Sequence, residues 1–409
     1  MRGAMERVII VGGGQAAGQA AASLRQEGYE GAVLMLTEEG HIPYQRPPLS
    51  KQFLAGEQDI ERVYLRPEKF YADNNVEIRT DARVEKLDLD GHQLSLAGGE
   101  SLEFSKLILA TGARVRRLEN FPGGELDGVA YLRTLDDAQA LKDALSKAQN
   151  LVVVGGGYIG LEVAAVAVAA GASVTVLEMM SRILQRVATP QLSDFYTNTH
   201  TAHGVSIKTD AKAVEFIGEN GALTGVQLED GTVLPADLVV VGIGVLPNVE
   251  LAEAAGLACD NGIVVDAQCA TSHPDVFAAG DCTNHPNSFA GKNIRLESVP
   301  NAMEQARVAA AMVCGKDKTY ESEPWFWSDQ YDVKLQMAGF SEGADSQVQR
   351  GDLASGAGIT FHLKGGVVIG ADAINSVRDF LACRKLVAGK VAPDVTKLAD
   401  PEVPLKELV

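Results

Sequence analysis

The stretch Val8-Ile-Ile-Val-Gly12-Gly-Gly14-Gln-Ala-Ala17 decides the fold. Its four apolar residues predict a buried parallel strand. The glycines that follow predict a tight turn into a helix that begins near Gln15. Gly12 permits the turn, Gly14 lets the backbone approach a pyrophosphate, and Ala17 lets the helix pack close to the strand. The N terminus of such a helix offers N–H groups and a partial positive charge to phosphates.

The residues after this stretch complete the same unit. An amphipathic helix is expected over about 15–27, and the apolar run Ala32–Leu36 predicts a second parallel strand. The acidic pair Glu38-Glu39 follows, where a carboxylate accepts hydrogen bonds from ribose hydroxyls. An ordinary glycine-rich turn explains the glycines, but not the strand, spacing, helix and carboxylate together. The pattern therefore predicts a dinucleotide-binding βαβ unit.

The composition is that of a globular protein with room for two or three domains. The chain has 409 residues, of which 46% are hydrophobic, and its formal net charge is −18. This acidity argues against binding to nucleic acid or anionic membranes by long-range attraction. The apolar run 163–177 is interrupted by polar and glycine residues, so we expect a helix and a strand there, not a membrane span. No signal peptide is expected, because residues 1–6 lead directly into the first strand.

The five cysteines are odd in number and widely spaced, and they form no Cys-x-x-Cys pair. This pattern favours reduced thiols in a cytoplasm. We therefore expect a cytoplasmic protein without a metal site or a redox-active disulfide. The five positions are Cys259, Cys269, Cys282, Cys314 and Cys383.

A proline-rich stretch, 42–51, follows the first βαβ unit. Pro43, Pro47 and Pro48 are expected to exclude a helix through it. Two interpretations stay open at this point. The stretch is either a rigid surface linker or a loop that lays Pro47 and Lys51 beside a ring system.

Short strands are expected over 76–79 and 82–89, with a hairpin over 93–102. The buried strand after them ends in Ala110-Thr111-Gly112, and these small residues allow the backbone to approach a cofactor closely. A bare turn at the end of the strand is the alternative for this motif.

A second copy of the opening pattern begins at Leu151. The segment Leu151-Val-Val-Val-Gly155-Gly-Gly157-Tyr-Ile-Gly160 is followed by an alanine-rich helix, the strand Ser173–Leu177 and Glu178. Two complete fingerprints are much more specific than one. They predict two adenine dinucleotides in two similar domains.

Glu178 indicates which nucleotide the second unit takes. A carboxylate at this strand end accepts hydrogen bonds from a ribose 2′-hydroxyl and repels a 2′-phosphate. The next arginine, Arg182, follows only after three other residues. We therefore favour NADH over NADPH at this site.

Two later strands are also expected to end in glycine. The first, within 236–244, ends in Gly242-Ile243-Gly244, and the second, within 274–281, ends in Gly280-Asp281. An aspartate there accepts hydrogen bonds from a sugar alcohol, or is an ordinary turn residue.

The last quarter of the chain contains a helix and a small cap. The helix is expected to open over 298–307, with Pro300 in its first turn, where proline is tolerated. From about Glu323 the sequence changes to alternating apolar strands, which indicate a small α+β cap.

These segments occur together, in this order, in a known family. The chain resembles the NADH-dependent ferredoxin reductases of the glutathione-reductase-like flavoproteins, and within them the putidaredoxin reductase type. The most specific matching stretches are Pro47-Pro-Leu-Ser-Lys51 and Trp325-Phe-Trp-Ser-Asp-Gln330. The matching segments cover nearly the whole chain: 46–51, 110–112, 155–162, 242–244, 280–281, 297–302 and 324–330.

The resemblance implies an α/β fold with two Rossmann-like dinucleotide-binding domains and a C-terminal α+β domain. The FAD-binding domain would be discontinuous, over 1–113 and 248–322. The NADH-binding domain, 114–247, would be inserted within it. Residues 323–409 would form the third domain and cover the flavin.

The resemblance also implies the residues that contact each cofactor. Glu38 would bind the adenosine ribose of FAD, Asp281 the ribityl chain and Val299 the pyrimidine edge of the flavin. The residues implied at FAD are Gly12, Gly14, Ala16, Ala17, Glu38, Arg46, Pro47, Lys51, Val84, Ala110, Thr111, Gly112, Arg133, Gly280, Asp281, Glu297, Ser298, Val299 and Trp327. Those implied at NADH are Gly155, Gly157, Tyr158, Ile159, Gly160, Glu178, Gly242, Ile243 and Gly244.

Lys51, Glu162 and Trp327 are the expected catalytic residues. Lys51 would lie near flavin N5, paired with Glu162, because a carboxylate in an apolar helix turn needs such a partner. A solvated helix carboxylate is the alternative for Glu162. Trp327 would lie near the flavin ring, and the helix near Pro300 would point its N terminus at the flavin.

The implied activity is the transfer of electrons from NADH through FAD, one at a time, to a 2Fe–2S ferredoxin. That ferredoxin would serve an oxygenase, with a haem mono-oxygenase as the expected case. Ferredoxins of this class are usually acidic, so a local basic patch would dock them. Arg307 is the candidate by family position, with a solvated helix cation as the alternative. A monomer is expected.

The positions of the cysteines differ from those of the wider superfamily, and this difference bears on which molecule accepts the electrons. No cysteine precedes Cys259, so the chain lacks the thiols of the disulfide reductases and of the peroxidases. Three alternatives stay open: a rubredoxin reductase, an NADH oxidase or peroxidase-like flavoenzyme, which the missing cysteine disfavours, and an NADH-sensing flavoprotein that binds a partner.

Overall fold

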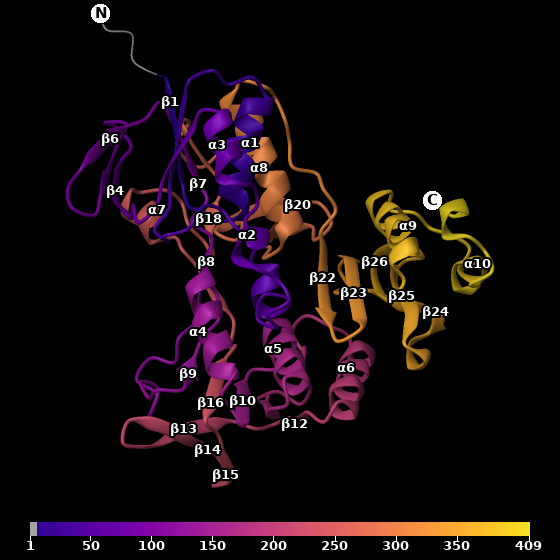
Figure 1. Ribbon diagram of the computed structural model, residues 1–409. Helices are drawn as coiled ribbons and strands as arrows, with labels where there is room; N and C mark the ends of the chain where they lie inside the picture. Colours follow the sequence, from indigo (N-terminus) through magenta and orange to yellow (C-terminus); the bar gives the residue numbers. More distant parts are fainter. Residues whose placement is uncertain (1–5) are drawn as a thin grey trace, which may run out of the picture. The chain divides into compact units, whose positions relative to one another are not determined.

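The computed structural model describes residues 6–409, and the expectation about residues 1–5 lies outside that range (Figure 1). The chain divides into two compact units. Unit 1 runs to Gln45 and continues over Ile60–Arg114 and Leu246–Phe326, whereas unit 2 comprises Arg46–Asp59, Val115–Val245 and Trp327–Val409. The three-domain division stays a prediction.

A five-stranded sheet forms the centre of unit 1, in the order β19-β7-β1-β2-β3. β1 lies between two parallel neighbours, and Ile9 pairs with Leu34 on one side and Leu107 on the other. Val8, Ile9 and Ile10 are fully buried, as expected for a parallel strand covered on both faces. The strands are β1 (Arg7–Val11), β2 (Ala32–Leu36), β3 (Val76–Arg79), β7 (Lys106–Leu109) and β19 (Val276–Ala278).

Different elements cover the two faces of this sheet. Alternate residues of β1 face two separate hydrophobic clusters, because successive side chains of a strand point to opposite faces. The helices α1 and α8 lie side by side in the first cluster, where small residues such as Ala17 and Ala306 let them approach closely (Figure 1). The helices of unit 1 are α1 (Gln15–Gln26), α2 (Ile60–Val63), α3 (Glu68–Asp73), α7 (Glu250–Ala254) and α8 (Val299–Val313).

Two small sheets complete unit 1. The sheet β4-β5-β6 contributes Leu94 and Leu102 to the second cluster, and its last two strands form the expected hairpin. The remaining sheet has the order β18-β20-β21. The bounds are β4 (Val84–Asp88), β5 (Gln93–Leu96), β6 (Ser101–Glu103), β18 (Ile263–Val264), β20 (Thr283–Asn287) and β21 (Lys292–Ile294).

Unit 2 repeats the parallel arrangement around the second fingerprint. Its sheet has the order β12-β11-β10-β16-β9, and β10 lies between β11 and β16 as β1 does between its neighbours. The strands are β9 (Val129–Ala130), β10 (Asn150–Val154), β11 (Ser173–Leu177), β12 (Ser206–Lys208) and β16 (Leu238–Val241). The helices are α4 (Leu135–Leu145), α5 (Tyr158–Ala169) and α6 (Pro190–Ala202).

Antiparallel sheets make up much of the remaining chain. A three-stranded sheet contains β13 (Ala213–Glu219), β14 (Ala222–Leu228) and β15 (Val233–Pro235), and the short strands β8 (Ala113–Val115) and β17 (Val245–Pro247) lie at the chain crossings between units. The C-terminal sheet has the order β22-β23-β26-β25-β24. Its elements are β22 (Trp325–Gln330), β23 (Val333–Gly339), β24 (Ser346–Asp352), β25 (Ala357–Lys364) and β26 (Val367–Ile374), with α9 (Val377–Ala388), α10 (Val395–Ala399), η2 (Leu353–Ser355) and η3 (Leu405–Glu407).

As expected from its prolines, the described stretch 42–51 has no helix running through it and contains only one short turn. Pro47–Ser50 form the 3₁₀ turn η1. Its two prolines occupy the first turn, where the backbone N–H groups have no intrahelical partner to lose. Leu49 and Ser50 are buried, so this segment is not the surface linker that one interpretation offered.

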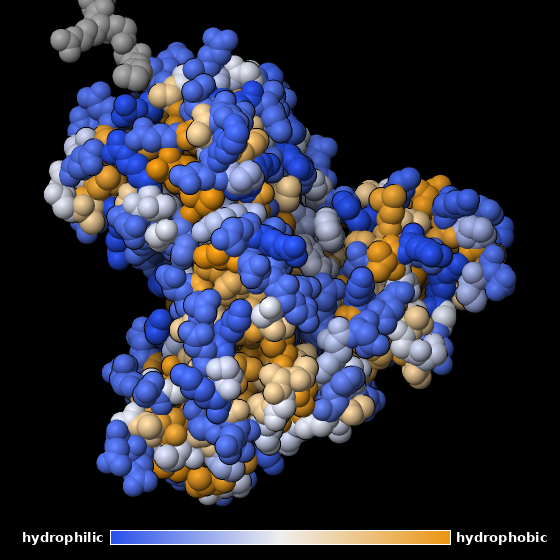
Figure 2. Space-filling view, viewed as in Figure 1, coloured by the Kyte–Doolittle hydropathy of each residue, from blue (hydrophilic) through white to orange (hydrophobic). Residues whose placement is uncertain are grey.

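None of the helices within residues 6–409 is long and apolar enough to cross a membrane. Figure 2 shows hydrophilic side chains over most of the face in view, interrupted by small hydrophobic patches. A mostly hydrophilic face agrees with the large formal negative charge of the chain.

Candidate active site

The two fingerprint turns have the same backbone geometry. Gly12 and Gly155 have φ angles of +129° and +112°. A Cβ atom on Gly12 would lie 2.1 Å from the carbonyl oxygen of Ala110, and one on Gly155 would lie 2.4 Å from that of Gly242. Only glycine fits, because each turn lies directly against the end of the neighbouring strand. The strand end at Ala110–Gly112 therefore lies against the first turn, and the strand end at Gly242–Gly244 lies against the second.

Each turn leads into a helix whose N terminus is capped by no side chain of the described residues. Gly14 and Gly157 are the N-cap residues of α1 and α5. Thr134, Thr189 and Ser298, by contrast, cap α4, α6 and α8 with their hydroxyl groups. A Cβ atom added to Gly14 or Gly157 would meet no atom of residues 6–409 within 4 Å. Open space beside an uncapped helix N terminus suits a pyrophosphate group, so both sites fit a dinucleotide.

The Glu178 carboxylate holds the second turn in place. Its Oε2 atom accepts a hydrogen bond from the Gly156 N–H, and its Oε1 atom accepts one from the Met180 N–H, both at 2.9 Å. A carboxylate oxygen has two lone pairs, so each oxygen can accept a further bond from a ribose hydroxyl.

Arg182 is occupied by its own loop. Its guanidinium donates to the carbonyl oxygens of Gln185 and Ala188 at 3.1 and 2.8 Å, and to Ser193 Oγ at 2.6 Å. These bonds fold the loop between β11 and α6. Arg182, the next arginine after Glu178 in the sequence, is thus committed to bonds with its own loop and with Ser193 of α6.

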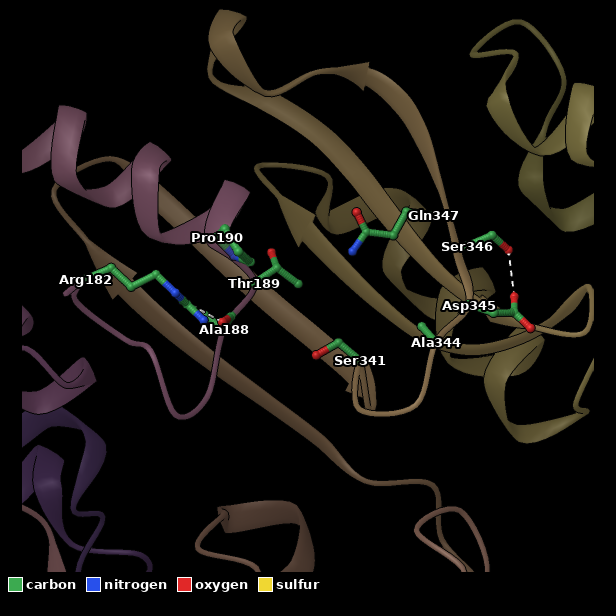
Figure 3. Close-up of a pocket in the computed structure, with 9 residues that line it drawn as sticks. All are labelled: Arg182, Ala188, Thr189, Pro190, Ser341, Ala344, Asp345, Ser346 and Gln347. Atoms are coloured by element: carbon green, nitrogen blue, oxygen red, sulfur yellow. Dashed lines mark hydrogen bonds between the residues drawn. The ribbon is translucent and has the colours of Figure 1, made fainter. Parts of the chain in front are cut away.

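A cavity of about 510 Å³ opens beside this loop, within unit 2 (Figure 3). Figure 3 shows the Arg182 guanidinium turned toward Ala188, and the carboxylate of Asp345 turned toward Ser346. The lining contains no residue expected at either dinucleotide: Arg182, Ala188, Thr189, Pro190, Ser341, Ala344, Asp345, Ser346 and Gln347.

The structure brings Lys51 and Glu162 together. Lys51 Nζ lies 2.7 Å from Glu162 Oε2, and the Glu162 side chain is 2% exposed. Ser50 Oγ donates to Oε2 at 2.5 Å, and Ser328 Oγ donates to Oε1 at 2.6 Å. The alternative of a solvated carboxylate for Glu162 therefore does not hold. The place of this pair beside a flavin stays a prediction.

Further hydrogen bonds continue from Ser328 away from Glu162. Gln330 Nε2 donates to Ser328 Oγ at 3.1 Å, and Gln330 Oε1 lies 2.7 Å from His200 Nε2. Tyr331 Oη lies 3.0 Å from His200 Nδ1. The sequence analysis did not predict this series of hydrogen bonds, although the alternation of side chains between the two faces of β22 was a usable signal. It places Ser328 and Gln330 on the same buried face.

In unit 1, the glycine-aspartate turn is held by a residue that the sequence did not suggest. Gln305 Oε1 accepts hydrogen bonds from the Gly280 N–H at 2.8 Å and from Thr283 Oγ1 at 2.9 Å. This amide fixes the backbone that carries Asp281.

A second unpredicted contact in unit 1 fixes the end of β7. Thr111 Oγ1 donates to the Asn248 carbonyl oxygen at 2.7 Å, and Asn248 Nδ2 donates back to that of Thr111 at 2.8 Å. The motif at 110–112 is therefore tied to the chain beyond β17.

The N terminus of α8 offers few free N–H groups. Val299 is its first residue, and Pro300 has no N–H group. Ser298 Oγ takes the N–H of Asn301 at 3.3 Å. The hydroxyl cap thus competes with any ligand at this helix end.

The structure also places several other residues that were expected to contact FAD. Arg46 Nη1 donates to the Arg133 carbonyl oxygen at 2.5 Å, so these two residues meet within unit 2. Glu38 pairs with Arg83 at 3.1 Å, and its side chain is 67% exposed. Val84 opens β4, Glu297 pairs with Arg295, and Trp327 lies in β22.

The remaining expectations concern NADH and the protein partner. Tyr158 Oη contacts Met337 Sδ at 3.1 Å, and burial raises the pKa of this phenol well above its ordinary value. Ile159 is 48% exposed at the start of α5. Arg307 forms an ion pair with Glu304 on its own helix.

The comparisons with known proteins agree with this geometry. The family model described as pyridine nucleotide-disulphide oxidoreductase matches residues 6–306, and the reductase C-terminal model matches residues 325–409. The chain belongs to this family. The expected fold class, with two dinucleotide-binding folds and a C-terminal domain, is confirmed.

Individual relatives match over the full length. The chain is 44% identical to a 5,5′-dehydrodivanillate O-demethylase ferredoxin reductase subunit of a Sphingobium species, over 98% of this chain and 97% of the relative. It is 42% identical to putidaredoxin reductase of Pseudomonas putida, over 99% and 97%. The crystal structure of a covalent putidaredoxin reductase–putidaredoxin complex has a TM-score of 0.96 and 42% identity, covering 99% of this chain and 98% of that one. The resemblance to the putidaredoxin reductase type is confirmed.

Three of the five cysteines, Cys269, Cys282 and Cys383, are buried. All five are free thiols, and burial raises the pKa of Cys269 and of Cys282, so these two are poor nucleophiles. Within residues 6–409, no group of three or more His, Cys, Asp or Glu side chains is placed to hold a metal ion.

Proposed function

We propose that this reductase oxidises NADH and passes the electrons through FAD, one at a time, to a 2Fe–2S ferredoxin. The observation that carries the proposal is the pair of open, uncapped helix N termini at Gly14 and Gly157. They occur in a chain whose whole length matches ferredoxin reductases. When bound, FAD accepts the two electrons of NADH and releases them singly.

The first turn would hold the pyrophosphate of FAD. Gly12, Gly14 and Ala17 form the turn, and Gln305 and Asn248 brace the two strand ends that carry Asp281 and Thr111. Such bracing keeps the binding groups in one geometry before the cofactor arrives, which lowers the ordering cost of binding. We assign the ribityl contact to Asp281 and the adenosine ribose to Glu38.

Lys51 would supply a fixed positive charge beside the flavin. Its partner Glu162 is buried and accepts bonds from two serine hydroxyls, so the carboxylate holds the ammonium group in one position. A positive charge near the ring favours the electron-rich form of a flavin. Trp327 would cover the ring and exclude water.

The second turn would hold NADH in preference to NADPH. Both carboxylate oxygens of Glu178 lie at the turn, where a 2′-phosphate would meet like charge. Arg182 does not offset that charge for a phosphate, because its donors are directed at its own loop and at Ser193 of α6. Ile159 provides an exposed apolar side chain at the start of α5 for the nicotinamide end.

The net charge of the protein bears on how it docks its partner, and its cysteines bear on its cellular location. An acidic ferredoxin would be repelled by the overall charge of −18, so docking would use a local cation, for which we propose Arg307. The ferredoxin would serve an oxygenase, with a haem mono-oxygenase as the expected case. The five free thiols support a cytoplasmic location, where disulfides are rare, and we further propose that the protein is a monomer.

A panel of acceptors tests the proposal. The purified holoenzyme is given NADH under nitrogen with a 2Fe–2S ferredoxin, with rubredoxin, or with dioxygen after air is admitted. Fast bleaching of the ferredoxin and slow turnover of the other two acceptors support it. Preference for rubredoxin, or rapid peroxide formation, would replace ferredoxin with that acceptor and leave both dinucleotide sites unaffected.

A further inference from the structure

A buried chain of five polar side chains leads from Glu162 to the turn after β22. The order is Glu162, Ser328, Gln330, His200 and Tyr331, joined by contacts of 2.6, 3.1, 2.7 and 3.0 Å. The first four side chains are at most 2% exposed, and all five lie in unit 2. A buried polar group that lacks a hydrogen bond costs free energy, so each donor in this chain must face an acceptor.

The charge of Glu162 sets the direction of every bond in this chain. An ionised carboxylate only accepts, so Ser328 must donate to it, and Gln330 must then donate its NH₂ group to Ser328 Oγ. The remaining amide oxygen of Gln330 accepts from His200 Nε2. The ring is thereby fixed as the Nε2–H tautomer, and its bare Nδ1 accepts from the Tyr331 hydroxyl.

The far end of the chain carries a strained residue. Tyr331 has a φ angle of +56°, a conformation that turns normally assign to glycine or asparagine and that costs of the order of 1 kcal/mol or more for other residues. In this conformation its ring stacks on His203 at 3.8 Å and its hydroxyl reaches His200. Burial also lowers the pKa of His200, which keeps the ring neutral.

The geometry points to His200 and Tyr331 as positioning residues for the Lys51–Glu162 pair. Acting through Gln330 and Ser328, they hold the carboxylate in the orientation that faces Lys51. This inference rests on the proposed function, because the role of Lys51 beside the flavin belongs to it. Tyr196 of α6 and Tyr331 beyond β22 contact the His200 ring, and His203, the residue just after α6, also acts on its pKa.

The tautomer of His200 tests the chain without reference to activity. The holoenzyme is labelled with ¹⁵N-histidine, and long-range ¹H–¹⁵N spectra are recorded at pH 7. The signal of His200 is assigned as the one missing from a His200→Gln variant. A neutral ring protonated on Nε2 is expected, whereas a ring protonated on Nδ1, or on both nitrogens, would overturn the inference.

Kinetics with ferricyanide as the acceptor tests the consequence for Lys51. For His200→Leu we expect kcat to fall about tenfold with the KM for NADH within twofold, because the change acts on the carboxylate and not on nucleotide binding. His200→Gln, whose amide NH₂ can replace Nε2–H, should retain at least a third of kcat. Tyr196→Phe is the matched control, since it removes from the same helix a buried hydroxyl that has no hydrogen-bond partner within residues 6–409.

The outcomes separate this inference from the proposed function. If NADH fails to bleach the flavin of the unaltered protein, the proposed function fails. The tautomer of His200 then still shows whether the hydrogen-bond chain from Glu162 to Tyr331 exists as described. If the unaltered protein turns over and His200→Leu keeps its full kcat, the positioning role is wrong. Should His200→Leu fail to fold, Tyr331→Phe replaces it, with an expected two- to fourfold loss of kcat and with unchanged kcat as the contradicting result.

Discussion

Lys51 Nζ lies 2.7 Å from Glu162 Oε2, and the two side chains are 10% and 2% exposed. The pair joins the proline-rich turn η1 to α5, the helix that begins at the second fingerprint. An ion pair buried this deeply needs further hydrogen bonds to offset desolvation, and Ser50 and Ser328 donate them. Two motifs that are separate in the sequence thus meet at one carboxylate.

Removing the carboxylate should destabilise the protein. Glu162→Ala leaves the Lys51 ammonium buried without its partner, at a cost of roughly 3–5 kcal/mol. We expect a clearly lower midpoint of denaturant unfolding. The double variant Lys51→Met with Glu162→Leu should recover much of that loss, because apolar residues need no partner. Equal midpoints for Glu162→Ala and the unaltered protein would show that the pair is not buried as described.

A methyl group added at one turn or the other should show which turn binds FAD and which binds NADH. Neither Gly14→Ala nor Gly157→Ala meets a protein atom within 4 Å, so both variants should fold normally by circular dichroism. The methyl would instead occupy the space meant for a pyrophosphate. We expect Gly14→Ala to lose bound FAD, seen as lost visible absorbance, and Gly157→Ala to keep FAD while its KM for NADH rises about tenfold or more. The reverse pattern would exchange the two assignments.

Nucleotide preference should depend on Glu178. Glu178→Gln removes the charge that repels a 2′-phosphate but keeps an oxygen for one of the two backbone donors. The ratio of kcat/KM for NADPH to that for NADH should rise about tenfold. Glu215→Gln, an exposed change on β13 in the same unit, is the control and should leave the ratio unchanged. No change in the ratio for Glu178→Gln would place the determinant elsewhere.

His285 should make the protein less stable in mild acid. Its ring is buried, both nitrogens have no hydrogen-bond partner among the described residues, and burial lowers its pKa to about 4. The unfolded chain, with an ordinary histidine, binds more protons between about pH 6.5 and 4, so stability falls as pH falls through that window.

This destabilisation should reach roughly 2 kcal/mol between pH 8 and pH 5. It should be smaller in a His285→Leu variant, measured as the shift of the urea midpoint. His203→Gln, which alters an exposed histidine, serves as the control and should behave like the unaltered protein. An undiminished pH dependence in His285→Leu would contradict the assignment.

Arg307 should affect the protein partner and not NADH. Arg307→Ala removes a cation that is paired with Glu304, and the local charge becomes more acidic. We expect the KM for ferredoxin to rise several-fold at low ionic strength, with the difference shrinking as salt is added. Turnover with ferricyanide provides the control and should be unchanged. An unchanged KM for ferredoxin would remove Arg307 from the docking surface.

Local patterns in the sequence were sufficient to predict the central strands of the two parallel sheets. The apolar run beginning at Val8 and its copy beginning at Leu151 each form a central parallel strand with the expected turn. The strand expected over 82–89 is shorter at both ends, as β4. The prolines excluded a longer helix around Pro47 as expected, but they did not predict the single turn η1, because the proline rule concerns helix interiors.

The hydrogen-bond chain could not be predicted in the same way. His200 and Gln330 are 130 residues apart, so their meeting depends on how α6 and β22 pack. The pairing of Lys51 with Glu162 was predictable, because a carboxylate surrounded by apolar helix residues needs a partner. A histidine in a helix carries no comparable signal, since most such residues are solvated or simply packed.

The most direct test is the stoichiometry of a single anaerobic turnover. One equivalent of NADH is mixed with the holoenzyme and an excess of oxidised 2Fe–2S ferredoxin, and reduced ferredoxin is counted by the loss of its visible absorbance. The account predicts two reduced ferredoxins per NADH, and far slower reduction with NADPH. A bleached flavin with no reduced ferredoxin would contradict it.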